Sequence, residues 1–346
     1  MNPKLESMRT LWLRCFPEDS EAFVNHFYAY YGHPSHHLTI EEGNEVIAML
    51  HHIDTYRYVF YKEPLRTAYI YAACTAPEHR GKGLMGQLIA RTLRLLHKKR
   101  IPLCVTIPAS ESLFQYYGRF GFVPAFKREC MKWDKEPLPD QPLDDMYLLD
   151  NGPDKILLPW MDDCINNRPT GHMWHSVRDL RFVLEANRIN GGFNALLINE
   201  HEKLTAAAVV ERNDFSLRIL DLVCADRTSV HNLLCLLRQT YSVPVWIDTL
   251  GGIGDPYFGA ARIINMPRML RTYARYPWVD SDETFYIKDD IIPENNGLYR
   301  MEGNRLHFKP CPVPPEGSTS IKVYDIAEYS RKCFSLEFGY MSMMLD

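Results

Sequence analysis

Residues 74–88, CTAPEHRGKGLMGQL, lead from an apolar stretch through a proline and a basic, glycine-rich turn into an amphipathic run. The preceding segment, TAYIYAACT (67–75), is nearly apolar on both faces, which predicts a central β-strand. Apolar residues recur at helical spacing over 84–99, which predicts a helix. A helix N-terminus presents unpaired N–H groups, and glycine lets an anion approach the backbone. The junction therefore predicts an anion site, and pyrophosphate is the anion that fits it best.

The turn has three other interpretations: a plain connector, a Walker phosphate loop and a dinucleotide-binding loop. A solvated basic turn that only connects strand to helix stays open on these letters alone. A Walker phosphate loop is excluded, because the string GxxxxGK[ST] is absent. GKGLMG (81–86) has the GxGxxG spacing of dinucleotide-binding folds. The antiparallel meander expected over 37–62 contradicts a βαβ unit at this place, so we reject that assignment.

Composition restricts the class of protein. The chain has 346 residues, 46% of them hydrophobic, which is enough for two or three packed cores. The net charge of -4 gives no basic footprint, so we expect no nucleic-acid partner. The nine cysteines lack CxxC spacing and indicate reduced thiols, with neither a disulfide framework nor a zinc site. No apolar run is long enough to span a membrane and no leader-like segment begins the chain, so we expect a soluble, cytoplasmic protein without a membrane partner.

The order of predicted elements occurs twice along the chain. Two helices (the second with Asp19 or Ser20 as N-cap), a meander, the central strand, the amphipathic helix, another strand, a short helix and a closing strand over 124–133 precede a proline-rich linker. After the linker a similar order follows, but CADRTSVHNLLCLL (224–237) has no glycine where the first half has its turn. A change of pattern near residue 256 predicts a third, α+β unit that begins with a helix over 261–274. We therefore predict domains at 1–135, 146–255 and 256–346, with one anion site per chain.

The combination of strand, turn and helix resembles the GNAT superfamily of acetyl-CoA-dependent acyltransferases. The signature [RQ]xxGx[GA] of that superfamily holds the coenzyme A pyrophosphate at such a junction. Arg80 and Gly83 match this signature, whereas Met85 replaces its last small residue.

A second segment strengthens the resemblance. YYGRFGFVPA (116–125) is similar to the Tyr-x-x-x-Gly-Phe segment of the superfamily, with Tyr117 at the tyrosine. Together with ASE (109–111), the chain resembles the enhanced intracellular survival branch, which tolerates an apolar residue at the last signature position. That branch has two tandem acyltransferase folds, the second without a working coenzyme site, and a C-terminal sterol carrier-type domain. The resemblance implies an α/β (α+β) fold with tandem GNAT folds and a C-terminal sterol carrier-type α+β domain.

The resemblance implies that acetyl-CoA binds as a cosubstrate, without a metal. The backbone at the end of the central strand would hold the pantetheine and polarise the thioester carbonyl, and the thiol of Cys74 would have no role. The glycine turn would hold the pyrophosphate. The expected coenzyme contacts are Ala73, Cys74, Thr75, Arg80, Gly81, Lys82, Gly83, Leu84, Met85, Gly86, Ser110 and Glu111.

Acetyl transfer needs a neutral amine, a polarised carbonyl and a proton for the leaving thiolate. By resemblance, Tyr117 is the general acid, and packing beside Tyr116 is its alternative role. The central strand has no acidic residue, so the base must come from elsewhere. The branch uses its terminal carboxylate, which implies Asp346 if the apolar tail 337–346 packs on the first domain; the alternative is that the tail completes the third core. The remaining candidate bases are Glu41, Glu42, Asp54 and His52.

These features indicate an N-acetyltransferase that acts on a primary amine of a small molecule. The alternative is a non-catalytic module that senses coenzyme A or binds a lipid in its C-terminal domain. The aromatic run FYAYY (27–31) and the acidic pair Glu41 and Glu42 are candidates to line an amine pocket. The sequence leaves open whether the chain forms a homo-oligomer.

Overall fold

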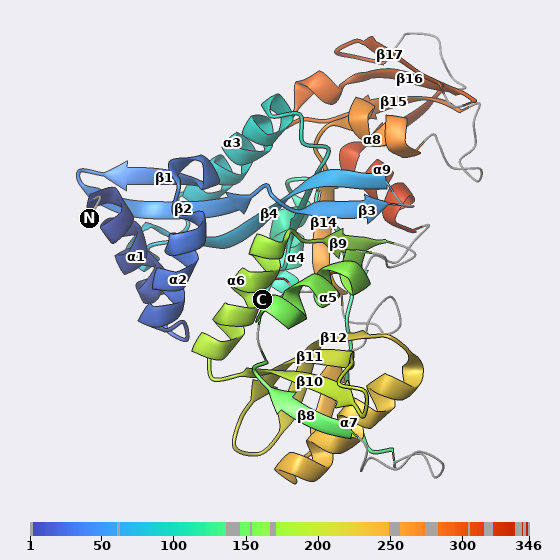
Figure 1. Ribbon diagram of the computed structural model, residues 1–346. Helices are drawn as coiled ribbons and strands as arrows, with labels where there is room; N and C mark the ends of the chain where they lie inside the picture. Colours follow the sequence, from blue (N-terminus) through green and yellow to red (C-terminus); the bar gives the residue numbers. More distant parts are fainter. Residues whose placement is uncertain are drawn as a thin grey trace.

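The structure is a computed structural model with mixed α/β architecture (Figure 1). It describes residues 3–60, 63–135, 146–152, 154–166, 171–248, 257–273, 283–303, 305–314, 321–335, 341 and 344. Within these ranges the strands form three sheets, and helices pack against them. The predicted mixed α/β class is confirmed.

The first sheet is built around the strand that the sequence places at its centre. Over the described ranges it is eight-stranded, with the order β1-β2-β4-β5-β14-β6, while β3 pairs with both β4 and β9. Its strands are β1 (His37–Glu42), β2 (Glu45–Ile53), β3 (Arg57–Phe60), β4 (Glu63–Thr75), β5 (Leu103–Thr106), β6 (Val123–Lys127), β9 (His172–Trp174) and β14 (Tyr257–Ile263). Because β4 is antiparallel to β2 and parallel to β5, it lies in the interior of the sheet.

Helices cover both faces of this sheet. They are α1 (Pro3–Cys15), α2 (Glu21–Tyr31), α3 (Leu84–Lys98) and α4 (Glu111–Gly118). Ile70 of β4 packs in the cluster formed with α3 and α4, which includes Leu88. Its neighbour Tyr69 faces the other way, into the cluster that contains Trp12 of α1 and Phe27 of α2. Burial on both faces is what the continuous apolar sequence of β4 predicts.

The second sheet has the order β7-β13-β12-β11-β10-β8 over the described residues. Its strands are β7 (Cys130–Trp133), β8 (Met146–Asp150), β10 (Phe193–Asn199), β11 (Leu204–Arg212), β12 (Leu217–Cys224) and β13 (Val245–Asp248), and its helices are α5 (Asp154–Asn166), α6 (Val177–Ile189) and α7 (Arg227–Tyr241). α7 packs on one face of the sheet. α5 and α6 lie between the two sheets, where α6 contacts α2 (Figure 1).

Two strands belong to other sheets than the predicted domains imply. β7 pairs in the second sheet and β14 pairs in the first. The predicted closing strand over 124–133 is wrong as a single strand, because β6 stays in the first sheet whereas β7 pairs with β13 in the second. The predicted helix over 261–274 is also wrong in its first part. Residues 257–263 form β14, which lies between β5 and β6, and helix α8 covers only Met266–Tyr273. The sheets therefore do not follow the predicted boundaries, and the division at 1–135, 146–255 and 256–346 stays a prediction.

A third sheet follows in the C-terminal part. It has the order β17-β16-β15-β18 over the described residues. Its elements are β15 (Thr284–Lys288), β16 (Gly297–Glu302), β17 (Arg305–Pro310), β18 (Lys322–Asp325) and helix α9 (Ile326–Ser335). α9 packs against β6 and β14, which joins this unit to the first sheet. The sterol carrier-type assignment of this unit stays a prediction.

Candidate active site

The candidate site begins where β4 and β5 separate. Their parallel pairing runs from Thr67 opposite Leu103 to Ile70 opposite Thr106 and ends there. β4 continues to Thr75, so its last residues have no strand partner on this side in the described part of the chain. Backbone N–H and C=O groups on such an open edge are available to an extended ligand.

A β-bulge shapes the open end of β4. Met49 lies opposite Cys74 and His51 opposite Tyr71, so the register shifts by one residue between these two pairs. Ala72, inside the bulge, has φ +44°, a left-handed conformation that is uncommon for a residue other than glycine. Bulges redirect the backbone and are frequent beside active sites. Here the bulge brings the backbone next to a cavity.

A cavity of about 470 Å³ occupies the space between the separated strands. One wall is the β4 segment 69–73, and the opposite wall is the segment 106–109 after β5. Tyr117 of α4, Phe258 of β14 and Trp12 of α1 also line it. Of the predicted site residues, the cavity thus brings together Ala73 and Tyr117.

The glycine-rich turn forms the N-terminus of α3. Gly83 is the N-cap residue with φ +75°, and Gly81 has φ +78°. These left-handed conformations favour glycine. In the described part of the chain no side chain caps α3, so its first N–H groups are left for solvent or a ligand. Arg80 and Lys82 are exposed on the same turn, so the predicted pyrophosphate contacts form a positive, open surface.

The corresponding helix of the second unit, α7, starts differently. Its N-cap is Asp226, whose Oδ1 accepts a hydrogen bond of 2.7 Å from the backbone N–H of Ser229. A carboxylate therefore already occupies the position that a bound anion would take. This cap supports the expectation of one coenzyme site per chain, which stays a prediction.

Cys74 and Thr75 connect the cavity to the turn. Cys74 is buried, and the thiol of Cys15 donates a hydrogen bond of 3.6 Å to the carbonyl of Thr75. The carbonyl of Thr75 accepts a hydrogen bond of 3.2 Å from Arg80 Nε, which holds the arginine beside the end of β4.

The first turn of α3 is partly covered by the chain after α4. Leu84 and Met85 are half-buried. A Cβ on Gly86 would lie 3.3 Å from the ring of Phe120, so glycine allows the close approach of α3 to this side chain. Leu84, Met85 and Gly86, which are predicted coenzyme contacts, therefore also pack α3 against the rest of the domain.

Ser110 and Glu111 begin α4. Ser110 caps the helix, since its Oγ accepts a hydrogen bond of 3.4 Å from the N–H of Leu113. Both residues are exposed, and neither lines the cavity. The structure gives Ser110 a capping role, and the predicted coenzyme contact of this pair stays a prediction.

Tyr117 is buried at the inner end of the cavity. It is 7% exposed, and its ring packs edge-on against that of Phe122. Thr106, which also lines the cavity, donates its Oγ1–H to the carbonyl of Ile70 at 3.2 Å, where the two strands separate. Burial raises the pKa of Tyr117 to about 12. The phenol is therefore protonated at neutral pH, as a general acid must be.

The acidic side of the cavity was not predicted from the sequence. Glu18 and Asp19 both line it. The indole Nε1 of Trp12 donates to Asp19 Oδ2 at 2.6 Å, and burial raises the pKa of this carboxyl. Asp19 was an expected helix cap, but Ser20 caps α2, since its Oγ accepts from the N–H of Phe23 at 3.1 Å. No sequence motif marks Asp19, because its site role depends on where α1 and β4 meet.

Arg128 lies on the opposite side of the cavity. Its Nε is 3.3 Å from Oδ2 of Asp248, which is fully buried. The guanidinium also stacks on the ring of Phe258, 3.6 Å from its centre. Asp248 also accepts hydrogen bonds from Arg218 at 3.0 and 3.2 Å, so two guanidinium groups share this one carboxylate. The cavity therefore has a positive side at Arg128 and a negative side at Glu18 and Asp19.

The predicted amine-pocket residues lie elsewhere. Phe27 and Tyr31, from the aromatic run, are fully buried in the core, and Glu41 pairs with Lys4 at 2.7 Å. Neither the aromatic run nor the acidic pair lines the cavity, and their role in amine binding stays a prediction.

The other candidate bases, Glu41, Glu42, Asp54 and His52, also lie outside the cavity lining. Asp54 pairs with Lys99 at 3.1 Å. Burial lowers the pKa of His52 to about 4, and the ring is fully buried. All four candidates are described, and none lines the cavity.

Asp346 lies outside the described residues. Two residues of the same tail, Met341 and Met344, are described and buried. Both line a small hollow with Arg128 and Phe258, two residues that also line the main cavity. The Sδ of Met341 would lie 2.7 Å from a Cβ on Gly259, so a glycine in β14 is needed for this approach. The described part of the tail therefore packs beside the cavity.

Over the described ranges, no three His, Cys, Asp or Glu side chains are grouped so that they would bind a metal ion. Over the same ranges, no helix has the length and apolar character needed to cross a membrane.

The first unit matches a known protein family. Residues 2–125 match the family model described as an acetyltransferase (GNAT) domain. These residues form a GNAT acetyltransferase domain. The match includes β4, the glycine turn, α3 and Tyr117, so the GNAT domain contains the cavity's main walls. The predicted enzyme class, an acetyltransferase, is confirmed.

Solved structures resemble the chain beyond its GNAT domain. A GCN5-related N-acetyltransferase from Kribbella flavida has a TM-score of 0.72 at 15% identity, covering 99% of this chain and 96% of that one. One from Anabaena variabilis has a TM-score of 0.72 at 17% identity, covering 94% and 86%. Eis1 from Mycobacterium abscessus has a TM-score of 0.68 at 12% identity, covering 96% and 86%. At such identities the likeness shows the fold alone. Among the curated proteins, none matches the chain in sequence.

Proposed function

We propose that the chain transfers an acetyl group from acetyl-CoA to a primary amine of a small, positively charged molecule. The observation that carries this proposal is the cavity between β4 and β5. It joins the open backbone of Ala73, the phenol of Tyr117 and the carboxylates of Glu18 and Asp19 in one space. The GNAT domain supports an acyl-CoA donor.

The coenzyme would lie along the open edge of β4. Its pyrophosphate would accept hydrogen bonds from the uncapped N-terminus of α3, with Arg80 and Lys82 beside it. The pantetheine would follow residues 73–75 toward the cavity. Backbone N–H groups of the bulge would then polarise the thioester carbonyl and stabilise the oxyanion that forms on attack.

Tyr117 would act as the general acid. As the amine attacks the carbonyl carbon and the C–S bond breaks, the departing thiolate takes the phenolic proton. The burial that keeps this phenol protonated also excludes water from the leaving group.

The base is proposed as the terminal carboxylate of Asp346. The support is the packing of Met341 and Met344 on Phe258, next to the cavity. Asp19 is the alternative base within the described residues. Its burial raises its pKa toward the range in which a carboxylate accepts a proton from an ammonium group.

The lining of the cavity favours a particular kind of acceptor. Trp12, Phe16 and Phe258 provide aromatic walls, and the two carboxylates provide negative charge. Aromatic faces and carboxylates both attract a cation. The acceptor would therefore carry a second positive charge beside the amine that is acetylated.

The test measures free thiol released from acetyl-CoA with diamines, matched monoamines and matched alcohols. Diamines should be acetylated with the highest kcat/KM, monoamines less well, and alcohols not at all. Asp19→Asn should lower kcat/KM for diamines by about 10-fold or more, the value of one charge-assisted hydrogen bond. No thiol release with any amine, or equal rates with alcohols, would refute the proposal.

A second set of variants tests the base. Deletion of Asp346, and separately extension of the chain by a few glycines and serines, should each lower turnover strongly while acetyl-CoA still binds. If both retain turnover while Asp19→Asn loses it with every amine, Asp19 is the base.

The C-terminal unit is proposed to be of the sterol carrier type. Its support is the α+β composition, a four-stranded sheet with α8 and α9 beside it. A direct check is binding of a fluorescent fatty acid, and its absence would leave this unit a structural support of the GNAT domain.

A further inference from the structure

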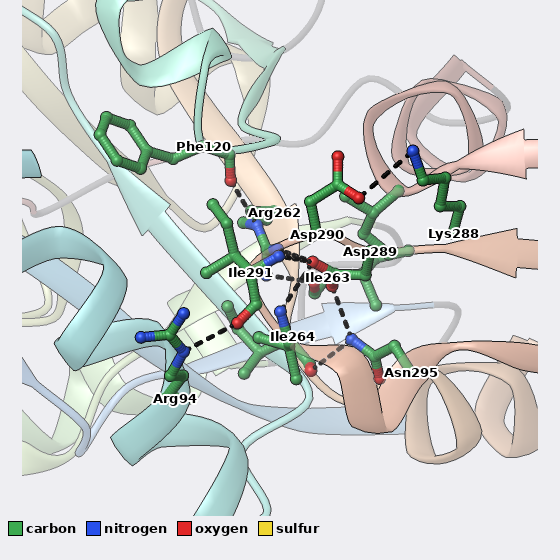
Figure 2. A network of polar contacts seen from close by, with 12 residues as sticks. Arg94, Phe120, Arg262, Ile263, Ile264, Lys288, Asp289, Asp290, Ile291 and Asn295 are labelled. Atoms are coloured by element: carbon green, nitrogen blue, oxygen red, sulfur yellow. Dashed lines mark hydrogen bonds and ion pairs between the residues drawn. The ribbon is translucent and has the colours of Figure 1, made fainter. Parts of the chain in front are cut away.

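A fully buried ion pair joins the C-terminal unit to the first sheet. Arg262 of β14 and Asp289, the residue after β15, lie 2.8 Å apart between Nη2 and Oδ1 (Figure 2). Arg262 is 0% exposed and Asp289 1%. A charge at such a site is costly unless it is paired and fully hydrogen-bonded.

Asp289 has this full set of partners. Its Oδ1 also accepts from the N–H groups of Ile291 and Ile292, each at 3.0 Å, and its Oδ2 accepts from Asn295 Nδ2 at 2.9 Å. Asn295 in turn donates to the carbonyl of Ile264, which follows β14 (Figure 2). The segment after β15 therefore holds the aspartate in one position, and the aspartate holds the guanidinium.

The other donors of Arg262 reach the chain after α4. Its Nε donates to the carbonyl of Phe120 at 2.5 Å, and its Nη1 donates to the carbonyl of Ile263 at 3.1 Å. Figure 2 shows the guanidinium between Phe120 on one side and Asp289 on the other. A Cβ on Gly121 would lie 3.0 Å from Arg262 Nε, so the arginine is packed directly against this turn.

This turn is connected to the proposed general acid. The N–H of Phe120 donates to the carbonyl of Tyr117 at 2.9 Å, and the N–H of Phe122 donates to the same carbonyl at 3.4 Å. Tyr117 lies one residue before the end of α4. A displacement of the Phe120 carbonyl would therefore move the end of α4 and the phenol that it carries.

We propose that Arg262 is a positioning residue for Tyr117, so that the C-terminal unit holds the general acid in place through Asp289. This inference rests on the function proposed above. The positioning role requires arginine, because one planar guanidinium donates hydrogen bonds to Phe120, Ile263 and Asp289 together. A lysine ammonium cannot make these three bonds with the same geometry.

The test is a double-mutant cycle on kcat with Arg262→Lys, Tyr117→Phe and the combined variant. Misplacement of a catalytic group by about 1 Å costs on the order of 100-fold. Arg262→Lys should therefore lower kcat by roughly 10- to 100-fold while the acetyl-CoA dissociation constant changes by less than about threefold. In the Tyr117→Phe background the same substitution should change kcat by less than about threefold, because no phenolic acid is left to misplace.

Arg94→Met is the matched control. Arg94 of α3 is exposed, and its Nε donates to the carbonyl of Ile291 at 3.0 Å, so it contacts the same segment without reaching Phe120 (Figure 2). Its kcat should be close to that of the wild type. A loss equal to that of Arg262→Lys would show a general effect of loosening this segment and would overturn the proposal.

Arg262→Met with Asp289→Asn keeps the test valid if the lysine variant does not fold. It removes both charges, while the asparagine retains an acceptor for the N–H groups of Ile291 and Ile292. The same pattern of kcat values is expected. A folded variant with wild-type kcat, or an undiminished loss in the Tyr117→Phe background, would overturn the positioning role alone. Full activity of Tyr117→Phe by itself would instead overturn the acid role of Tyr117 and, with it, this inference.

Discussion

At the residue scale, Gly83 and Tyr117 represent the two ends of the candidate site. Gly83 takes a left-handed conformation at the uncapped start of α3, where any side chain would stand in front of the free N–H groups. Tyr117 is deeply buried in the cavity that Thr106 also lines, at the point where β4 and β5 separate. Both were predictable from short motifs, because the local sequence alone determines the turn and the helix that carry them.

Gly83→Glu should abolish acetyl-CoA binding without unfolding the chain. A Cβ at this position would meet no atom within 4 Å, so the side chain has space, although the left-handed φ of +75° adds a strain of about 1–2 kcal/mol. The negative charge of the glutamate repels the pyrophosphate. The dissociation constant and a thermal melt measure the two effects. Gly191→Glu is the matched control, since Gly191 has φ +85° and equally open surroundings. An unchanged dissociation constant in Gly83→Glu would mean that the turn is only a connector.

Tyr117→Phe should lower kcat by about 100-fold or more, the usual value of general-acid catalysis. The affinity for acetyl-CoA should change little, because only the phenolic proton is lost. Steady-state kinetics at saturating amine separate the two quantities. Tyr116→Phe is the neighbouring control, since Tyr116 does not line the cavity. Equal activity of both variants would return Tyr117 to a packing role.

At the element scale, β2 carries two adjacent buried histidines. His51 lies among aromatic rings, including that of Trp12, and burial lowers its pKa to about 3. His52, on the other face of the strand, has its pKa lowered to about 4 for the same reason. Each is therefore neutral in the folded state throughout the range in which an unfolded histidine, with a pKa near 6.5, takes up a proton.

The free energy of unfolding should consequently fall as the pH is lowered below about 6.5. Each histidine contributes a slope of up to about 1.4 kcal/mol per pH unit, because the unfolded state binds the extra proton. Urea unfolding at several pH values between 7.5 and 4.5 measures it. His51→Phe should reduce the slope, whereas His201→Gln, at an exposed position, should not. The same slope in His51→Phe as in the wild type would contradict this assignment.

At the scale of the whole molecule, local patterns in the sequence predicted the elements but not their partners. β4, α3 and α4 were found because burial on two faces, helical spacing and a glycine turn are each visible within about 15 residues. β14 was missed because Ala260, Ala261 and Ile263 suit a buried strand or a buried helix equally. Only their pairing with β5 and β6, more than 130 residues away, decides between the two. Asp19 and Arg262 were missed for the same reason, since distant elements give them their roles.

We infer that this chain, in which a similar order of elements occurs twice, has one working coenzyme site. Calorimetric titration of the whole chain with acetyl-CoA, in the absence of amine, tests it most directly. One site per chain is expected in the wild type and none in Gly83→Glu. Two equivalent sites, or a site that survives in Gly83→Glu, would contradict it.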